Sequence, residues 1–316
     1  MSLMKSNLKY GAFIASLLLV MPLVAYADQG KGQYASQVLQ LQMTAMTCRN
    51  TYVTGYLGDV VSVINNSTIT STLANTDIPK LGTDYTSLQA DASANNTAQF
   101  KTDVKTYNGD TKTANLDARA DIKAAHSKTV NATLRSDIKQ LLTTYQTCTF
   151  GVKQQYAQLK AQMFNHAISH AQNMTEKMTS RGLNTTALEN TVSTANGQVQ
   201  QFENAVNNAQ NSTELKAALQ SFCLYNGCKN PSDFHFAAKV VIDTDQARLN
   251  LLASKNSTVT YQSLVAQTQA DINNAQAALN VVGSSQYQGN QSSTVWGDLK
   301  AASDIMHQLQ MANHKH

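Results

Sequence analysis

Charged residues are scarce in this chain of 316 residues. Lysine, arginine, aspartate and glutamate make up 14% of it, and 24 basic residues nearly balance 20 acidic ones. Nucleic-acid binding requires basic residues concentrated on one face, so this balance argues against a nucleic-acid partner. The composition also lacks the Glu and Lys networks expected of a thermophilic protein. Gln, Asn, Thr and Ser fill the polar positions instead.

Long apolar runs are missing after residue 27. The richest later window, 57–64, is much shorter than the ~17 apolar residues that a membrane-spanning helix requires. We therefore expect no transmembrane segment in the mature chain. The same shortage argues against a pore-forming toxin that keeps a long apolar hairpin in reserve for the bilayer.

Residues 1–27 have the pattern of a secretory signal peptide. Two lysines precede the apolar stretch 11–24, and residues 25–27, Ala-Tyr-Ala, have the small-x-small form of a cleavage site. Cleavage would leave Asp28 first, with 22 basic and 20 acidic residues and a net charge of +2. The alternative, an uncleaved anchor, is disfavoured by Pro22 and the short apolar core. No cysteine follows the site, which disfavours a lipoprotein. We expect a secreted, periplasmic or cell-surface protein.

Cysteine is limited to four residues, Cys48, Cys148, Cys223 and Cys228. In an exported chain they can form two disulfides, in any of three pairings. We favour Cys223 with Cys228, because only a short turn sequence containing Asn-Gly separates them. Cys48 then pairs with Cys148. A zinc site of four thiolates would need reduced cysteines and two short spacings, whereas the chain has one.

Proline is rarer still, with three residues in the chain, and the stretch 134–181 contains none and only one glycine, Gly151. Its apolar residues recur in steps of three and four and predict a helix of about fifty residues. They form two stripes roughly a third of a turn apart, so this central helix should have neighbours on two sides. The first stripe is Leu134, Ile138, Leu141, Tyr145, Cys148, Val152, Leu159, Met163, Met174 and Met178, and the second is Ala157, Ala161, Phe164, Ile168 and Ala171.

The same periodicity predicts further helices. The expected ranges are 34–65, 84–107, 110 into the central helix, 186–209, 212–222, 232–252, 261–282 and 294–311. We expect a loop over 66–82, a break at 108–110 and a Gly/Ser/Gln/Asn linker over 283–293. Gly182 should adopt a left-handed cap after the central helix. Thr186 and Glu189 have the spacing of a capping box for the next helix.

Together these patterns predict an all-α fold, an elongated antiparallel helical bundle with coiled-coil-like hairpins that is held together by disulfides. The cleanest heptad is Leu188, Val192, Ala195, Val199, Phe202, Val206 and Ala209. The expected organisation is a signal peptide at 1–27, an N-terminal bundle with the long central helix at 28–182, and C-terminal hairpins packing on it at 183–316. One continuous domain is the alternative.

Two histidines on the central helix are the sharpest candidate for chemistry. His166 and His170 lie one turn apart and share a helix face, with Met163 and Met174 on nearly the same line. Imidazoles beside thioethers favour copper over zinc. A zinc-peptidase helix would need Glu directly after the first His, where this chain has Ala167. The competing interpretation, which we favour, is that the histidines flank a core stripe and the methionines fill it.

A second group of methionines and histidines lies near the C-terminus. We expect at most loose metal binding by this tail. The group is Met306, His307, Met311, His314 and His316. Asp243 and Asp245, two residues apart, fall on different helix faces and should not form a carboxylate pair.

The sequence carries no catalytic signature, so we interpret the chain as an exported helical scaffold or interaction protein. We expect a protein or cell-envelope partner and no cofactor. The alternative function is copper binding or copper handling outside the cytoplasm by His166, His170, Met163 and Met174.

Overall fold

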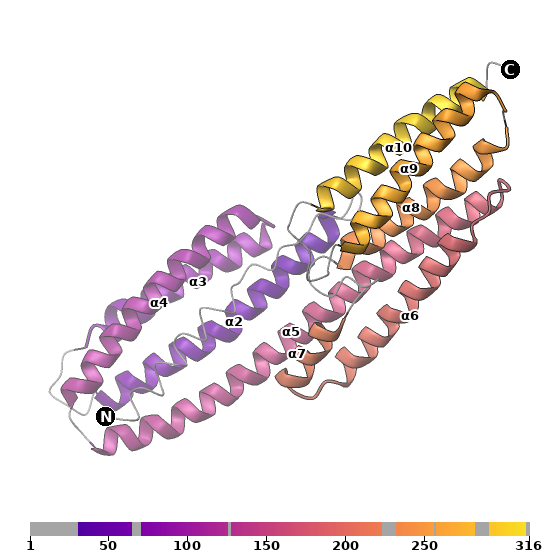
Figure 1. Ribbon diagram of the computed structural model, residues 1–316. Helices are drawn as coiled ribbons and strands as arrows, with labels where there is room; N and C mark the ends of the chain where they lie inside the picture. Colours follow the sequence, from indigo (N-terminus) through magenta and orange to yellow (C-terminus); the bar gives the residue numbers. More distant parts are fainter. Residues whose placement is uncertain are drawn as a thin grey trace. The chain divides into compact units, whose positions relative to one another are not determined.

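The computed structural model describes residues 31–64, 71–125, 128–222, 232–255, 257–281 and 291–313 (Figure 1). Within these ranges the chain is helical apart from short links and forms no strand, which confirms the all-α prediction. No helix in the described ranges is both long and apolar enough to span a membrane. The helices are α2 (Lys31–Ile64), α3 (Ile78–Ser93), α4 (Thr97–Ala125), α5 (Lys128–Thr179), α6 (Thr186–Asn208), α7 (Ser212–Ser221), α8 (Ser232–Ala253), α9 (Val259–Val281) and α10 (Gln291–Asn313), with a π-helical turn η2 (Leu73–Asp77) before α3.

Helix α5 is the predicted central helix and has 52 residues. Its second apolar stripe is buried throughout, and no member exceeds 2% exposure. This stripe faces α6 and α7, which both contact α5. Residues of the first stripe, including Tyr145 and Cys148, meet α2 instead. The expectation of neighbours on two sides is therefore confirmed.

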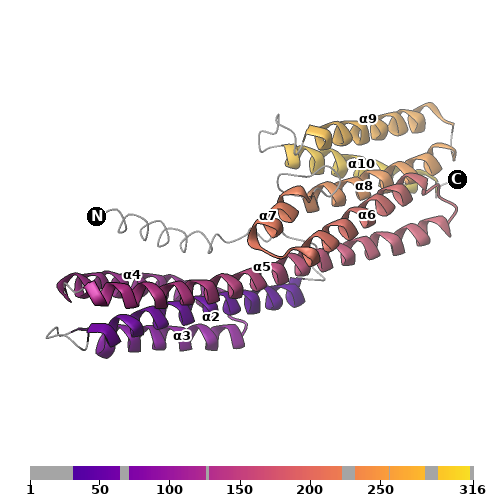
Figure 2. The same ribbon diagram turned by 90° about the horizontal axis from the view of Figure 1, so that it is seen from below.

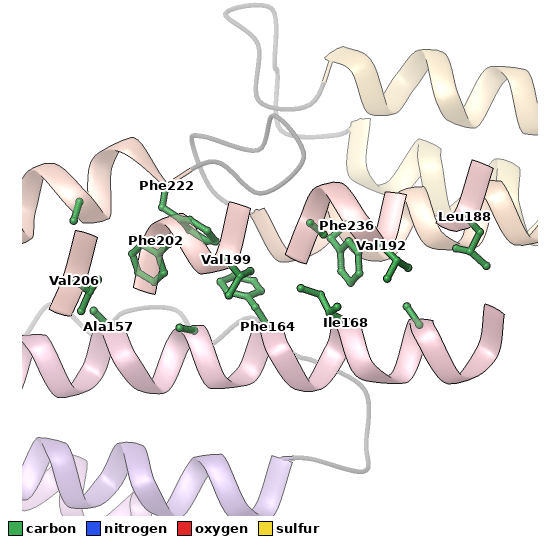
Figure 3. Close-up of a cluster of buried hydrophobic side chains, with 14 of the residues drawn as sticks. Ala157, Phe164, Ile168, Leu188, Val192, Val199, Phe202, Val206, Phe222 and Phe236 are labelled. Atoms are coloured by element: carbon green, nitrogen blue, oxygen red, sulfur yellow. The ribbon is translucent and has the colours of Figure 1, made fainter. Parts of the chain in front are cut away.

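Three phenylalanines close the core between α5, α6 and the end of α7 (Figure 3). The ring of Phe222 lies 5.2 Å from that of Phe164 and 4.2 Å from that of Phe202, centroid to centroid. Burial of an aromatic side chain contributes about 1.5–3 kcal/mol. This cluster therefore fixes α7 against the α5–α6 pair.

The end of α5 has the predicted cap. Gly182 adopts φ +79°, its N–H donates to the Thr179 carbonyl at 2.9 Å, and the Leu183 N–H donates to the Met178 carbonyl at 3.2 Å. These two bonds form a Schellman motif, which satisfies carbonyls that the helix end would otherwise leave unpaired. A left-handed backbone favours glycine, so the residue type sets where α5 ends.

The start of α6 differs by one residue from the prediction. Thr185, not Thr186, is the N-cap residue, and its hydroxyl donates to the Glu189 carboxylate at 2.8 Å instead of accepting a backbone N–H. The Thr185 hydroxyl also lies 2.7 Å from that of Thr179. The predicted capping box is wrong because these side-chain bonds across the link occupy the hydroxyl.

Helices α5 and α6 run antiparallel. Gln154 donates to the Val206 carbonyl at 2.9 Å, and further along α5 Asn165 donates to Glu203 at 2.7 Å. Every residue of the predicted heptad on α6, together with Ala209 just after it, is buried. The expected hairpin is confirmed as a helix pair.

The helix break expected at 108–110 is wrong. Helix α4 continues through it, because both sides of the segment are held by packing and by charge: the Asn108 side chain accepts from Arg49, and Asp110 pairs with Lys80. Such contacts outweigh the weak helix preference of Asn and Gly. The actual break lies at 94–96, where Asn95 takes φ 55°.

The loop expected over 66–82 is wrong from Leu73 onward, where η2 and then α3 begin; residues 65–70 lie outside the described ranges. Pro79 stands in the first turn of α3, where a missing N–H costs nothing. Leu73 and Leu81 are both fully buried. Their burial favours helix where the local sequence indicated a turn.

Helices α8, α9 and α10 pack side by side (Figure 2). Their core includes Ile272, Leu279, Leu299 and Leu309. One face of α8 belongs to this core, while Phe236 and Ala247 belong to the α5–α6–α7 core. Residues 32–316 accordingly group as one compact unit. The division into an N-terminal bundle and C-terminal hairpins at residue 182 stays a prediction.

Candidate binding groove

A groove of about 460 Å³ lies between the first half of α2 and the middle of α5. Carboxamides dominate its lining, and no charged residue takes part. The lining residues are Ser36, Gln37, Gln40, Leu41 and Thr44 from α2 and Gln155, Gln158, Leu159 and Gln162 from α5.

Contacts further along the same two helices fix the walls of the groove. The Sγ atoms of Cys48 and Cys148 are 1.98 Å apart, at disulfide distance, and their Cα atoms are 5.8 Å apart. Tyr52 and Tyr145 stack at 5.2 Å between ring centroids. As the residue numbers of these contacts rise along α2, the numbers of their partners on α5 fall, so the two helices are antiparallel. Cys223 and Cys228 lie outside the described residues.

Gly55 of α2 lies directly against Leu141 of α5. A Cβ atom placed there would lie 2.9 Å from a methyl carbon of Leu141, well inside van der Waals contact. A larger residue would therefore require the Leu141 side chain to move at this level. Glycine here therefore serves packing between helices and not a turn, since it lies within α2.

Some groove carboxamides are committed to neighbouring helices. The Gln40 amide donates to the Ala92 carbonyl of α3 at 3.0 Å, and Gln158 donates to Asn207 of α6 at 2.9 Å. Gln155 and Gln162 are exposed. The Gln37 side-chain oxygen is buried without a hydrogen-bond donor. The groove thus presents uncharged donors and acceptors, suited to a neutral polar ligand.

The predicted histidines lie next to this groove. His166 is exposed, and its ring lies 6.5 Å from that of Tyr34 on α2, edge to face. His170 is also exposed, one turn further along α5. The contact between residues 34 and 166 follows the same antiparallel order as the other contacts between α2 and α5. This ring pair therefore marks one end of the groove.

The two predicted methionine ligands are less accessible than the histidines. Met163 and Met174 are both half-buried, and Met174 packs against the α5–α6–α7 core. The Met174 sulfur already accepts the Thr244 hydroxyl at 4.0 Å. Within the described ranges no three His, Cys, Asp or Glu side chains gather in an arrangement that could hold a metal ion.

The second methionine and histidine group is divided by burial. Met306 is buried in the α8–α9–α10 core, whereas His307 and Met311 are exposed. His314 and His316 lie outside the described residues.

Comparison with known proteins gives no match for this chain. No family model matches it, and neither a curated protein nor a solved structure gives a match. Functional inference therefore rests on the residues themselves.

Asp243 and Asp245 of α8 have separate surroundings, as their spacing predicts. Asp243 accepts from the Thr191 hydroxyl of α6 at 2.5 Å and pairs with Lys239. Asp245 is 4% exposed, and burial raises its pKa to about 6, although Arg248 at 3.8 Å acts in the opposite direction. The two carboxylates do not form a joint acid–base pair.

Sequence reasoning missed the groove. Its walls come from segments more than a hundred residues apart, so no local spacing marks it. The available signal was the abundance of Gln on the polar faces, which indicates uncharged surfaces without saying where two of them meet.

Proposed function

We propose that this chain is an exported helical scaffold or interaction protein of the cell surface or periplasm, and that it binds rather than catalyses. The groove between α2 and α5 carries the proposal. It runs between two helices over several turns, and its lining is mainly carboxamides with two hydroxyl groups and no acid–base pair. Residues 1–27, with the pattern of a signal peptide, support export.

The partner in this proposal is a protein with an extended, polar segment. Each Gln carboxamide offers one acceptor and a donor group, the same pair that a peptide unit offers. The groove lining is uncharged, so binding should depend little on salt. Leu41 and Leu159 supply apolar contact inside an otherwise polar surface.

The scaffold proposal includes a covalent disulfide between Cys48 and Cys148, which would hold the two walls of the groove together outside the cytoplasm. It also includes coiled-coil-like packing within the α5–α6 and α9–α10 hairpins, supported by their three-and-four apolar spacing. The N-terminal bundle 28–182 would supply the groove and the hairpins of 183–316 would brace α5.

Photo-crosslinking tests the groove. A photoreactive residue at Gln162, in the mature chain incubated with the envelope fraction of the source cell, should give a discrete adduct with one protein. Gln155→Arg should abolish that adduct by placing a charge and a long side chain in the groove.

The matched control is a photoreactive residue at Gln146, which is exposed on the same helix. It lies nine residues from Gln155 and so about 180° around α5. Equal adducts from positions 146 and 162, or an adduct that survives Gln155→Arg, would rule out the groove as the binding surface.

A further inference from the structure

Aspartates recur every seven residues on both sides of the α3–α4 contact. In an antiparallel helix pair, residues with the same spacing on the two segments lie opposite each other. Each aspartate of one series therefore faces an aspartate of the other. The pairs are Asp77 with Asp117, Asp84 with Asp110, and Asp91 with Asp103. All six side chains are buried or half-buried, although α3 and α4 have ample exposed surface for charges.

Two of these pairs are in direct contact. The Asp84 carboxyl is within hydrogen-bonding reach of Asp110, and the Asp91 carboxyl is within reach of Asp103. One oxygen each of Asp84, Asp91 and Asp110 is buried without a donor. Two facing carboxylates offer only acceptors, whereas one proton between them supplies the missing donor for both.

Neighbouring groups decide which carboxyl keeps the proton. Lys80 of α3 lies 2.7 Å from Asp110, which favours the anion there and leaves the proton to Asp84. Asp103 accepts from the Gln99 amide at 2.7 Å, and Asp77 of η2 accepts from Thr72 at 3.4 Å. From α2, Arg49 approaches this hairpin, but it binds Asn108 and lies over the Tyr107 ring.

The same arrangement recurs between other helices. Asp59 of α2 faces Asp137 of α5, and Asp271 of α9 faces Asp298 of α10. One Asp271 oxygen is again buried without a donor. These five pairs account for ten of the 20 acidic residues in the chain.

We propose that the α3–α4 hairpin is a proton-dependent joint. The two carboxyl pairs in direct contact each share one proton in acidic surroundings and hold the two helices together there, and the hairpin loosens as the medium becomes neutral. The chain is accordingly suited to an acidic compartment or an acidic exterior. This inference stands independently of any binding partner.

The pKa directions agree with this geometry. Burial, then the hydrogen bond to Asp110, raise the pKa of Asp84 to about 6. Burial first and the facing carboxylate second also raise the pKa of Asp77, Asp91, Asp59 and Asp298. A raised pKa means that the folded chain binds the proton more tightly than the unfolded chain. For Asp84 the stabilisation is complete below about pH 4 and is lost as the pH rises through about 6.

The pKa of Asp110 shifts in the opposite direction because of Lys80. Its hydrogen bond lowers the pKa of Asp110, so this carboxylate stabilises the fold above the ordinary aspartate pKa of about 4 and ceases to do so in stronger acid. Asp84 stabilises the hairpin at low pH and Asp110 stabilises it at higher pH. Together the two effects place the stability maximum of the hairpin between about pH 4 and pH 5.

Urea unfolding of the mature chain, followed by circular dichroism at about pH 4.5 and about pH 7, tests the proposal. Wild type should be less stable at the higher pH. Asp84→Asn supplies a permanent donor to Asp110, so it should match wild type in acid and exceed it at neutral pH. We expect roughly a tenfold difference in the folding equilibrium constant, which already allows for solvent screening of a half-buried pair.

Asp304→Asn is the matched control, since Asp304 is exposed on α10 and should leave the pH dependence of wild type unchanged. The infrared band of protonated carboxyl groups supplies a readout that needs no stable variant. In wild type it should persist to about pH 5.5, above the ordinary range of aspartate. Equal stability of wild type at both pH values, an unchanged pH dependence in Asp84→Asn, or early loss of the band would overturn the proposal.

Discussion

At the scale of single residues, buried aspartates are held in two different ways. Asp243 has both a cation, Lys239, and a hydroxyl donor, Thr191, inside the packing. Among the described residues, the cation recorded beside Asp245 is Arg248 at 3.8 Å, and burial has the larger effect on the pKa of Asp245. Its raised pKa has the same sign as that of Asp84, so it adds to the stability that is lost as the pH rises through about 6.

Copper binding is a prediction at the same scale. If the exposed His166 and His170 take one copper ion with Met163 and Met174, His170→Ala should weaken binding at least tenfold, or about 1.4 kcal/mol. Protonated imidazole cannot act as a ligand, so affinity should fall as the medium is made acidic. Titration of a chain that ends at Ala312 measures this without the histidines of the tail.

His307→Ala provides the control for copper binding, because His307 is also exposed but lies on α10. It should not alter the affinity. Absence of binding at micromolar copper, or equal loss in both variants, would mean that His166 and His170 are surface residues of a structural helix. Met174 would then serve in core packing and as the acceptor for Thr244.

At the scale of an element, two glycines of the α5–α6 hairpin should respond oppositely to alanine. Gly182 has φ +79°, so Gly182→Ala should cost about 1 kcal/mol through backbone strain, although nothing lies within 4 Å of the new methyl group. Gly197 lies inside α6, also with open space around it, so Gly197→Ala should stabilise the helix by roughly 0.5–1 kcal/mol.

Thermal unfolding of the two alanine variants measures both effects. A change of 1 kcal/mol moves Tm by about 2–4 °C in a chain of this size. If Gly182→Ala raised Tm, the left-handed cap would not be what ends α5. If Gly197→Ala lowered it, unseen contacts at that position would outweigh helix propensity.

Helix ends were predictable where the neighbouring residues in the sequence determine them. Gly182 was identified correctly, because a left-handed residue after an apolar repeat is a local property. Asn95 and Gly109 show where prediction from the local sequence fails. Asn-Gly at 108–109 has turn chemistry but is held in α4 by Arg49 and Lys80, residues far away in sequence. Tertiary contacts thus moved the break to Asn95, which no apolar pattern marks.

At the scale of the whole molecule, the all-helical class and the pairing of α5 with α6 follow from periodicity and short links. The groove and the carboxyl pairs do not, because each depends on which helix faces meet. Residues 77, 84 and 91 show a seven-residue repeat in the sequence, but only the antiparallel pairing with α4 gives that repeat a physical meaning.

The disulfide between Cys48 and Cys148 is the prediction that concerns the molecule as a whole. It would close a loop across a sequence separation of 100 residues. On the chain-entropy model such a loop stabilises the fold by up to ~4.7 kcal/mol, because the unfolded chain loses freedom. Cys48→Ser with Cys148→Ser should therefore lower Tm by on the order of 10 °C.

Cys223→Ser with Cys228→Ser is the matched comparison. That loop is short, so the same model assigns it roughly 2 kcal/mol and a correspondingly smaller fall in Tm. Peptide mapping without reductant should recover Cys48 joined to Cys148 and Cys223 joined to Cys228. A crosslink from Cys48 to either of the other two would contradict the contact between α2 and α5, and the groove would then lose one of its walls. Equal losses of Tm in the two double variants would instead show that strain or residual structure, and not loop length, determines what each bridge contributes.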